Sequence, residues 1–205
     1  MSRATPVRDR ILDAAHDLVL AQGFSATTVD AVLGAAGASK GAFFHHFPSK
    51  RALGHALVER YAAGDHAVLD EFMAAAETQS HDPAEQVVEF VRGFEHAADA
   101  MALTQPGCLF VSFVYEQVPD TDGVRPLITA AIELWRSRIA EKLVLAQEAG
   151  RLADDVDVDS LADHVFTTFE GAFILARATR DATHVRAQLG HLRRYLELLL
   201  DVAPT

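Results

Sequence analysis

Fourteen consecutive residues, 37–50 (GASKGAFFHHFPSK), combine basic, aromatic and small side chains in a pattern that suits contact with a polyanion. Lys40 and Lys50 carry positive charge, and ammonium groups bind phosphate oxygens through charge-assisted hydrogen bonds. The adjacent His45 and His46 add further hydrogen-bonding groups. Elsewhere histidines and acids are scattered without zinc-ligand spacing, and no Gly-x-Ser-x-Gly or phosphate-loop motif is present. The sequence therefore predicts binding chemistry, and we expect no catalytic residue, no metal site and no cofactor.

Two helices are predicted upstream of this segment. Pro6 suits a first helical turn, and Gly23 is placed to end that helix as a left-handed cap. The threonine pair at 27–28, with Asp30 close behind, predicts the N-cap of a second, short helix. That helix is expected to run from about residue 28 to residue 36 and to end at Gly37. These helices form the support for the basic segment.

The basic segment itself predicts a third short helix. Ser39 is an N-cap for a helix that continues to about His46, before a Pro-Ser pair starts the next helix. Three short helices with a glycine turn between the second and third match a helix-turn-helix. A recognition helix enters the DNA major groove when its N-terminal end carries small residues, and Gly41 and Ala42 meet that need.

Spacing along the third helix predicts which aromatic side chains face the protein. Phe43 and Phe47 lie four residues apart, on a face that we expect to pack inward, onto Leu18, Val32, Leu33 and Leu53. Phe44, His45 and His46 are then directed toward the nucleic acid.

The rest of the chain is also predicted to be helical, which gives an all-α fold with about nine helices. Apolar periodicity and Pro/Gly breaks place the further helices at about 49–78, 83–102, 106–118, 122–149, 157–179 and 183–201. We therefore expect two domains: a helix-turn-helix domain at 1–50 and a larger helical domain at 51–205.

Net charge supports this division. The whole chain of 205 residues carries a formal charge of −11, which is unusual for a nucleic-acid binder. Residues 1–60, however, hold 7 basic and 5 acidic side chains, or +2, whereas the remaining residues hold 11 basic and 24 acidic ones, or −13. This asymmetry predicts that only the N-terminal domain faces DNA.

The single cysteine, Cys108, excludes an internal disulfide and favours a reducing compartment. The N-terminus lacks the apolar region of a signal peptide, and the longest uncharged run contains proline and glycine. We expect a cytoplasmic protein with no membrane association.

From Ile11 to Leu53 the chain resembles the TetR/AcrR family of bacterial one-component transcriptional regulators. The residues that carry the resemblance are Gly23-Phe24, Thr27-Thr28-Val29, Ala36-Gly37-Ala38-Ser39-Lys40-Gly41, Phe43, His46-Phe47 and Pro48-Ser49-Lys50. Together with the predicted orientation of the third helix, the resemblance predicts DNA contacts by Thr28, Ser39, Lys40, Gly41, Ala42, Phe44, His45, His46 and Lys50. The family usually has tyrosine at the position of Phe44, so we expect Phe44 to contact a sugar or a thymine methyl group instead of a phosphate.

The resemblance also implies a function. It implies a ligand-responsive regulator, which we take to be a repressor, that binds a palindromic operator in double-stranded DNA as a homodimer. A small apolar or aromatic effector bound by the C-terminal domain would release the operator. The first alternative to this function is a repressor that senses oxidants or electrophiles through Cys108, because a thiol at a helix N-terminus is activated toward reaction. The second alternative is a helical interaction protein that does not bind DNA.

Two apolar stripes on the helix at 157–179 predict that it is covered on two sides, either by its own domain and a second copy or entirely within a monomer. The family resemblance implies the second copy. The last helix carries a similar stripe with steps of 3 and 4 residues. The predicted dimer interface consists of Val158, Leu161, Val165, Ala172, Ala176, Val185, Leu189, Leu192, Leu196 and Leu199.

Large apolar side chains are abundant in the middle of the chain, and such side chains line ligand cavities in helical domains as well as cores. The resemblance implies an effector site between the helices from 83 to 179. The predicted lining residues are Phe90, Phe94, Met101, Cys108, Phe110, Phe113, Gln117, Trp135, His164, Phe166, Phe169 and Phe173.

Overall fold

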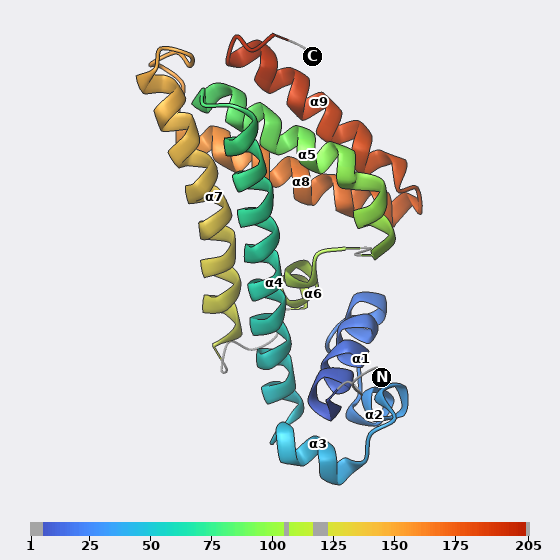
Figure 1. The fold of residues 1–205 in the computed structure, drawn as a ribbon. Coiled ribbons are helices and arrows are strands. Elements are labelled where there is room, and N and C mark those ends of the chain that lie inside the picture. The colour runs from blue at the N-terminus through green and yellow to red at the C-terminus, as the bar shows by residue number, and fades with distance from the viewer. Residues whose placement is uncertain (1–5, 105–106, 117–122, 204–205) are drawn as a thin grey trace. The chain divides into compact units, whose positions relative to one another are not determined.

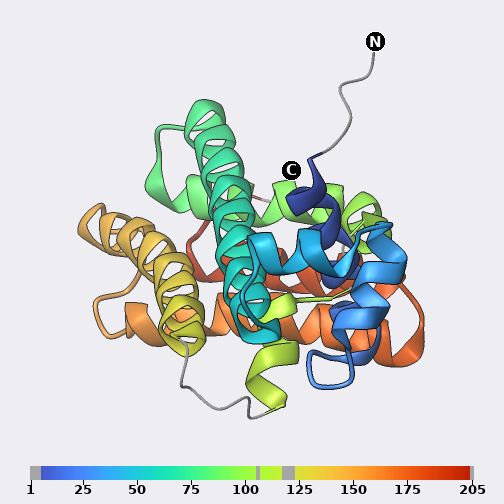
Figure 2. The ribbon, with the colours of Figure 1, turned by 90° about the horizontal axis from the view of Figure 1, so that it is seen from below.

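The structure is a computed structural model that describes residues 6–104, 107–116 and 123–203, with only the backbone given for 102–104. Within these ranges every regular element is a helix (Figures 1 and 2). The helices are α1 Val7–Gln22, α2 Val29–Ala36, α3 Lys40–His46, α4 Lys50–Gln79, α5 Pro83–Thr104, α6 Leu109–Tyr115, α7 Val124–Glu148, α8 Val158–Thr179 and α9 Thr183–Leu199. The predicted all-α fold is confirmed.

The described chain forms two compact units. The first unit lies within residues 1–64 and 108–130, and the second within 65–107 and 131–205. The first unit therefore contains the predicted helix-turn-helix domain, the N-terminal half of α4 and also α6. Helices α4 and α7 each contribute residues to both units.

Local capping signals fix both ends of α2 and the start of α3. The Thr28 hydroxyl accepts a hydrogen bond of 3.1 Å from the Ala31 amide at the start of α2. The Ser39 hydroxyl accepts one of 3.2 Å from the Ala42 amide at the start of α3. Gly37 ends α2 in the left-handed conformation (φ 59°, ψ 40°), which glycine adopts without steric cost.

The core of the first unit is built around α1. Its buried side chains include Ile11, Leu12 and Val19. Both Phe43 and Phe47 are buried, at 0% and 2% exposure, which confirms that they anchor α3.

The second unit has a larger core, in which α9 packs against α5 and α8 (Figure 1). Four aromatic side chains lie near its centre: Phe90, Phe94, Trp135 and Phe169. Aliphatic residues of α8 and α9, such as Val165 and Leu189, complete it.

Candidate nucleic-acid interface

The residues predicted to contact DNA lie on the surface of the first unit, at the N-terminus of α2, along α3 and at the start of α4. Seven of them are exposed and two, Ala42 and Lys50, are half-buried. The exposed ones are Thr28, Ser39, Lys40, Gly41, Phe44, His45 and His46.

Neighbouring phenylalanines on α3 have opposite environments. Phe43 is fully buried, whereas Phe44 is 55% exposed and meets the Phe43 ring edge-on at 5.2 Å between centroids. Beside Phe44, the rings of His45 and His46 lie 4.9 Å apart, and both side chains are exposed. The outer face of α3 thus presents one apolar ring and two imidazoles on a helix that is anchored from beneath.

Gly41 is not required by the packing of the protein. A Cβ atom built at this position would meet only the Ser39 hydroxyl, at an ordinary 3.9 Å, and the residue has no positive φ. Glycine inside a helix costs about 1 kcal/mol relative to alanine. A small residue that the fold does not need is consistent with the close approach of something outside the chain, as in a DNA groove.

Lys40 forms an ion pair with Asp30 of α2, with 3.1 Å between Nζ and Oδ1. Both side chains are largely exposed, so water screens the pair and its contribution to stability is small. The lysine is therefore free to exchange its partner for a phosphate. Sequence reasoning did not identify Asp30 as its counter-ion.

Lys50 makes contacts within the first unit that sequence reasoning did not predict. Its Nζ donates a hydrogen bond of 3.1 Å to the Ser25 carbonyl and lies 4.7 Å from the centre of the Phe24 ring. Partial burial lowers the pKa of Lys50, and the negative charge of Glu116 opposes that shift. The ammonium is thus fixed against the loop between α1 and α2, next to the N-terminus of α2.

The predicted effector residues divide between the two units. Phe90, Phe94, Trp135 and Phe169 form one aromatic cluster in the second unit, with Phe94 5.0 Å from Phe169 and 5.6 Å from Trp135. Met101, Phe166 and Phe173 are partly buried against the same core.

The remaining predicted effector residues lie elsewhere. Phe110 and Phe113 of α6 belong to the first unit, where they pack on Tyr61 at 4.9 Å and on Phe24 at 4.8 Å. Cys108 precedes them as the N-cap residue of α6 and is half-buried. The predicted effector residues of α6 thus pack within the first unit, whereas those of α5, α7 and α8 named above pack within the second.

His164 is exposed beside Tyr195, and Gln117 lies outside the described residues.

The aromatic cluster has a polar edge that sequence reasoning missed. The Trp135 indole N–H donates a hydrogen bond of 2.7 Å to the Asp65 carboxylate. Burial raises the pKa of Asp65, while the Trp135 hydrogen bond and the neighbouring His66 act in the opposite direction. Next to it, the buried Nε2 atom of His66 has no hydrogen-bond partner among the described residues.

Seven of the ten residues predicted for the dimer interface are buried within the single chain, where α9 packs against α5 and α8. These are Leu161, Val165, Ala172, Val185, Leu189, Leu192 and Leu196; Val158, Ala176 and Leu199 are half-buried against the same core. The exposed large apolar side chains of the two helices are instead Ile174, Leu175, Tyr195 and Leu198.

Metal-ligating side chains do not gather in groups of three or more anywhere in the described part of the chain. Among the described helices, none is both long and apolar enough to cross a membrane.

Comparison with known proteins gives two matches that together span most of the chain. The family model described as "Bacterial regulatory proteins, tetR family" matches residues 11–57. The model described as "Tetracyclin repressor-like, C-terminal domain" matches residues 83–192.

Individual relatives are similar over most of their length. The chain is 27% identical to the HTH-type transcriptional repressor DhaR of Mycobacterium sp. (strain GP1), over 86% of this chain and 85% of DhaR. It is 29% identical to the transcriptional regulator AcuR of Cereibacter sphaeroides, over 85% and 78% of the two chains. The crystal structure of regulatory protein TetR from Rhodobacter sphaeroides superposes with a TM-score of 0.77 and 27% identity, over 93% of this chain and 99% of that one.

Proposed function

Because the chain belongs to the TetR family of bacterial regulatory proteins, we propose that it is a transcriptional repressor that binds a palindromic operator as a homodimer. A small effector bound by the second unit releases the operator. The observation that carries the DNA-binding part is the outer face of α3, where exposed Phe44, His45 and His46 are held out by fully anchored Phe43 and Phe47.

Each predicted contact has a physical role in this proposal. Helix α3 lies in the major groove, with Gly41 and Ala42 at the base edges and Phe44 against a sugar or a thymine methyl. Thr28 brings the N-terminus of α2 to a phosphate, where helix N–H groups favour an anion. Lys40 and Lys50 add charge on either side of the groove.

The homodimer forms through the exposed apolar side chains of α8 and α9. Ile174 and Leu175 of α8 and Tyr195 and Leu198 of α9 are 37% to 85% exposed in the single chain. Helices that keep such side chains in water after completing their own core gain stability by covering them, and two-fold pairing does so in both copies at once. A two-fold dimer presents two α3 helices to the two half-sites of a palindrome.

The effector binds at the aromatic cluster of the second unit. Phe90, Phe94 and Phe169 supply apolar surface for a small apolar or aromatic molecule. Asp65 and Trp135 lie at the polar edge and supply a hydrogen-bond acceptor and donor, which now bind each other. An effector that takes over one of these partners is recognised by its polar group as well as by its apolar surface.

Coupling requires only that the effector favour one of two conformations. A difference of 1–3 kcal/mol in effector affinity, or about 5- to 150-fold, is the usual range. Helix α4 contributes residues to both units, so a change beside Asp65 reaches Lys50 along one continuous helix.

Cys108 is a second candidate for the sensing group. It is half-buried at the start of α6, a helix of the first unit, so a covalent adduct on its thiol would disturb that helix directly. Under this alternative, Cys108→Ser leaves DNA binding intact and abolishes release by para-benzoquinone. Unchanged release in that variant eliminates the alternative and leaves the aromatic cluster.

The proposed function is tested by selecting duplexes from a random-sequence pool with the purified protein. We expect a palindromic site, a footprint on both half-sites and an affinity that falls steeply with salt, because phosphate contacts release counterions. Lys40→Ala/His46→Ala should lose this binding. If the wild-type protein enriches no sequence, the proposal is rejected and the helical interaction protein becomes the better explanation.

A further inference from the structure

Helix α6 ends in a carboxylate that is hydrogen-bonded to the loop between α1 and α2. Glu116, the C-cap residue of α6, accepts hydrogen bonds from two consecutive amides: Phe24 N–H to Oε1 at 2.7 Å and Ser25 N–H to Oε2 at 2.6 Å. Both oxygens of one carboxylate are thus used on adjacent backbone donors. Charge-assisted hydrogen bonds of this kind are about twice as strong as neutral ones.

The loop is shaped to receive this carboxylate. Gly23 adopts φ +87°, and a Cβ atom at that position would lie 2.0 Å from Glu116 Oε1, so any other residue would displace the glutamate. The Phe24 side chain is buried against Phe113 of α6, and a Cβ on Gly54 would lie 2.7 Å from its ring. The loop and α6 therefore fit each other through backbone, ring and carboxylate together.

The same two loop residues, Phe24 and Ser25, also contact Lys50. The Ser25 carbonyl accepts the Lys50 hydrogen bond at 3.1 Å, and the Phe24 ring lies beneath the ammonium at 4.7 Å. A single loop residue thus lies between the two charges, since Ser25 donates its N–H to Glu116 while its carbonyl receives Lys50. Hydrogen bonds in such a chain polarise and strengthen one another.

We infer that Glu116 is a positioning residue for DNA binding, which acts through Phe24 and Ser25 to hold the Lys50 ammonium where it meets an operator phosphate. An ammonium has three donors, and one bond to Ser25 leaves two for phosphate oxygens. Without the carboxylate the loop relaxes, and Lys50 must be ordered at the moment of binding, which costs side-chain entropy. The inference rests on the proposed function, because it concerns the same DNA-binding surface.

Through these hydrogen bonds, the position of α6 affects the position of Lys50. Along the chain α6 follows α5 and precedes α7, both of which contribute residues to the second unit. A displacement of α6 withdraws both carboxylate oxygens from the loop at once, and the two amides are then left without their acceptors together.

The test compares Glu116→Gln with Glu59→Gln on a duplex selected by the wild-type protein. Glutamine keeps the size of the side chain but offers one acceptor oxygen and no charge. Glu59 is an exposed acid of the same unit and controls for the change in net charge. We expect Glu116→Gln to weaken binding about tenfold and to reduce the salt slope by about 0.9 for each phosphate that the variant no longer binds. Glu59→Gln should leave affinity unchanged or slightly higher.

A second variant separates positioning from a general effect on the fold. In a Lys50→Met background, Glu116→Gln should change affinity less than twofold, because the ammonium that it positions is already absent. Amide hydrogen exchange, measured by NMR without DNA, should be faster at Phe24 and Ser25 in Glu116→Gln than in the wild-type protein. Helices α1 and α2 should melt at the same temperature in both proteins.

Three outcomes would overturn the inference: equal or tighter binding by Glu116→Gln, an undiminished effect in the Lys50→Met background, or unchanged exchange of the two amides. Failure of the wild-type protein to select any duplex is a different result, since it removes the proposed function itself.

Discussion

The Trp135 indole donates a 2.7 Å hydrogen bond to the Asp65 carboxylate, which places a partly buried acid at the edge of an aromatic cluster. This acid carries a cost, because burial raises its pKa above the ordinary value for aspartate. Below the ordinary pKa of about 3.9 the carboxyl is protonated in both the folded and the unfolded chain, and the cost vanishes. As pH rises from there through the raised pKa, the folded chain must bury a charge and loses stability.

Asp65→Asn should therefore raise the melting temperature at pH 7, and the difference from wild type should shrink toward pH 4. The asparagine oxygen still accepts the Trp135 hydrogen bond, so that contact is kept while the buried charge is removed. Asp181→Asn is the matched control, because hydrogen bonds from Thr183 lower the pKa of Asp181. That variant should be less stable than wild type at pH 7. If both variants changed the melting temperature at pH 7 in the same direction, the opposite pKa shifts assigned to Asp65 and Asp181 would be contradicted.

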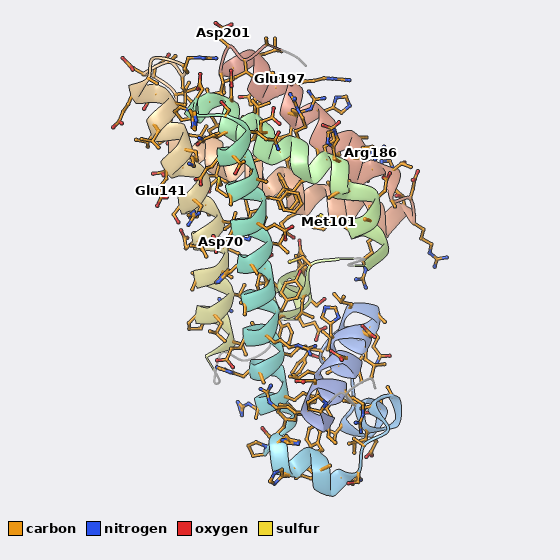
Figure 3. All side chains as sticks on the ribbon, viewed as in Figure 1. Asp70, Met101, Glu141, Arg186, Glu197 and Asp201 are labelled. Carbon is orange, nitrogen blue, oxygen red and sulfur yellow. The ribbon has the colours of Figure 1, made fainter. Side chains whose placement is uncertain are left out.

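A buried ion-pair network joins α5 to α9, and Glu197, labelled in Figure 3, lies at its centre with 5% exposure. Its Oε1 atom accepts from Arg193 at 2.5 Å and from Arg92 at 3.1 Å, while Glu95 binds Arg193 at 2.6 Å. Removing one partner from a buried ion pair costs about 3–5 kcal/mol. Glu197→Ala should lower the free energy of unfolding by this amount in urea titrations.

The control is the exposed pair of Asp99 and Arg186, which lie 2.8 Å apart with side chains more than half exposed. Asp99→Ala should cost less than about 1 kcal/mol. If the two alanine variants lose equal stability, the network does not fasten α9 to α5.

Local signals explain how much of the fold the sequence predicts. Thr28, Gly37 and Ser39 cap helices through contacts within three to five residues, so their roles are visible in the sequence. The six later helices likewise begin and end within a few residues of their predicted bounds, since proline, glycine and polar breaks separate them. Periodicity also places Phe43 and Phe47 in the core correctly.

Partners distant in sequence are not predictable in this way. The apolar stripe of α9 is buried, as its periodicity predicts. Periodicity does not show which element covers Leu189 and Leu192, and in the structure α5 and α8 of the same chain do so. The aromatic composition of α6 likewise predicts burial without naming Phe24 as the partner of Phe113. Glu116 meets an amide 92 residues away in the chain, and no short-range pattern marks such a contact.

Phe43 and Phe44 should separate folding from DNA binding. Phe43 is fully buried, so Phe43→Ala should cost about 3–5 kcal/mol of stability. Phe44 is 55% exposed, so Phe44→Ala should change stability by no more than about 0.5 kcal/mol and still weaken binding to the selected duplex. Thermal melts and fluorescence anisotropy distinguish the two effects. An unaffected Kd in Phe44→Ala would show that this ring does not contact DNA.

Asp30 should restrain DNA binding through its ion pair with Lys40. The two side chains lie 3.1 Å apart at the surface, and the acid stands beside the phosphates that the lysine is proposed to bind. Asp30→Asn removes both the competing partner and a repulsive charge, which we expect to tighten binding by on the order of 0.5–1 kcal/mol per α3 helix. The gain should diminish as salt is raised, because exposed charges are screened. Asp17→Asn, the same change at another exposed site of the first unit, is the control, and an equal gain there would reduce the effect to net charge alone.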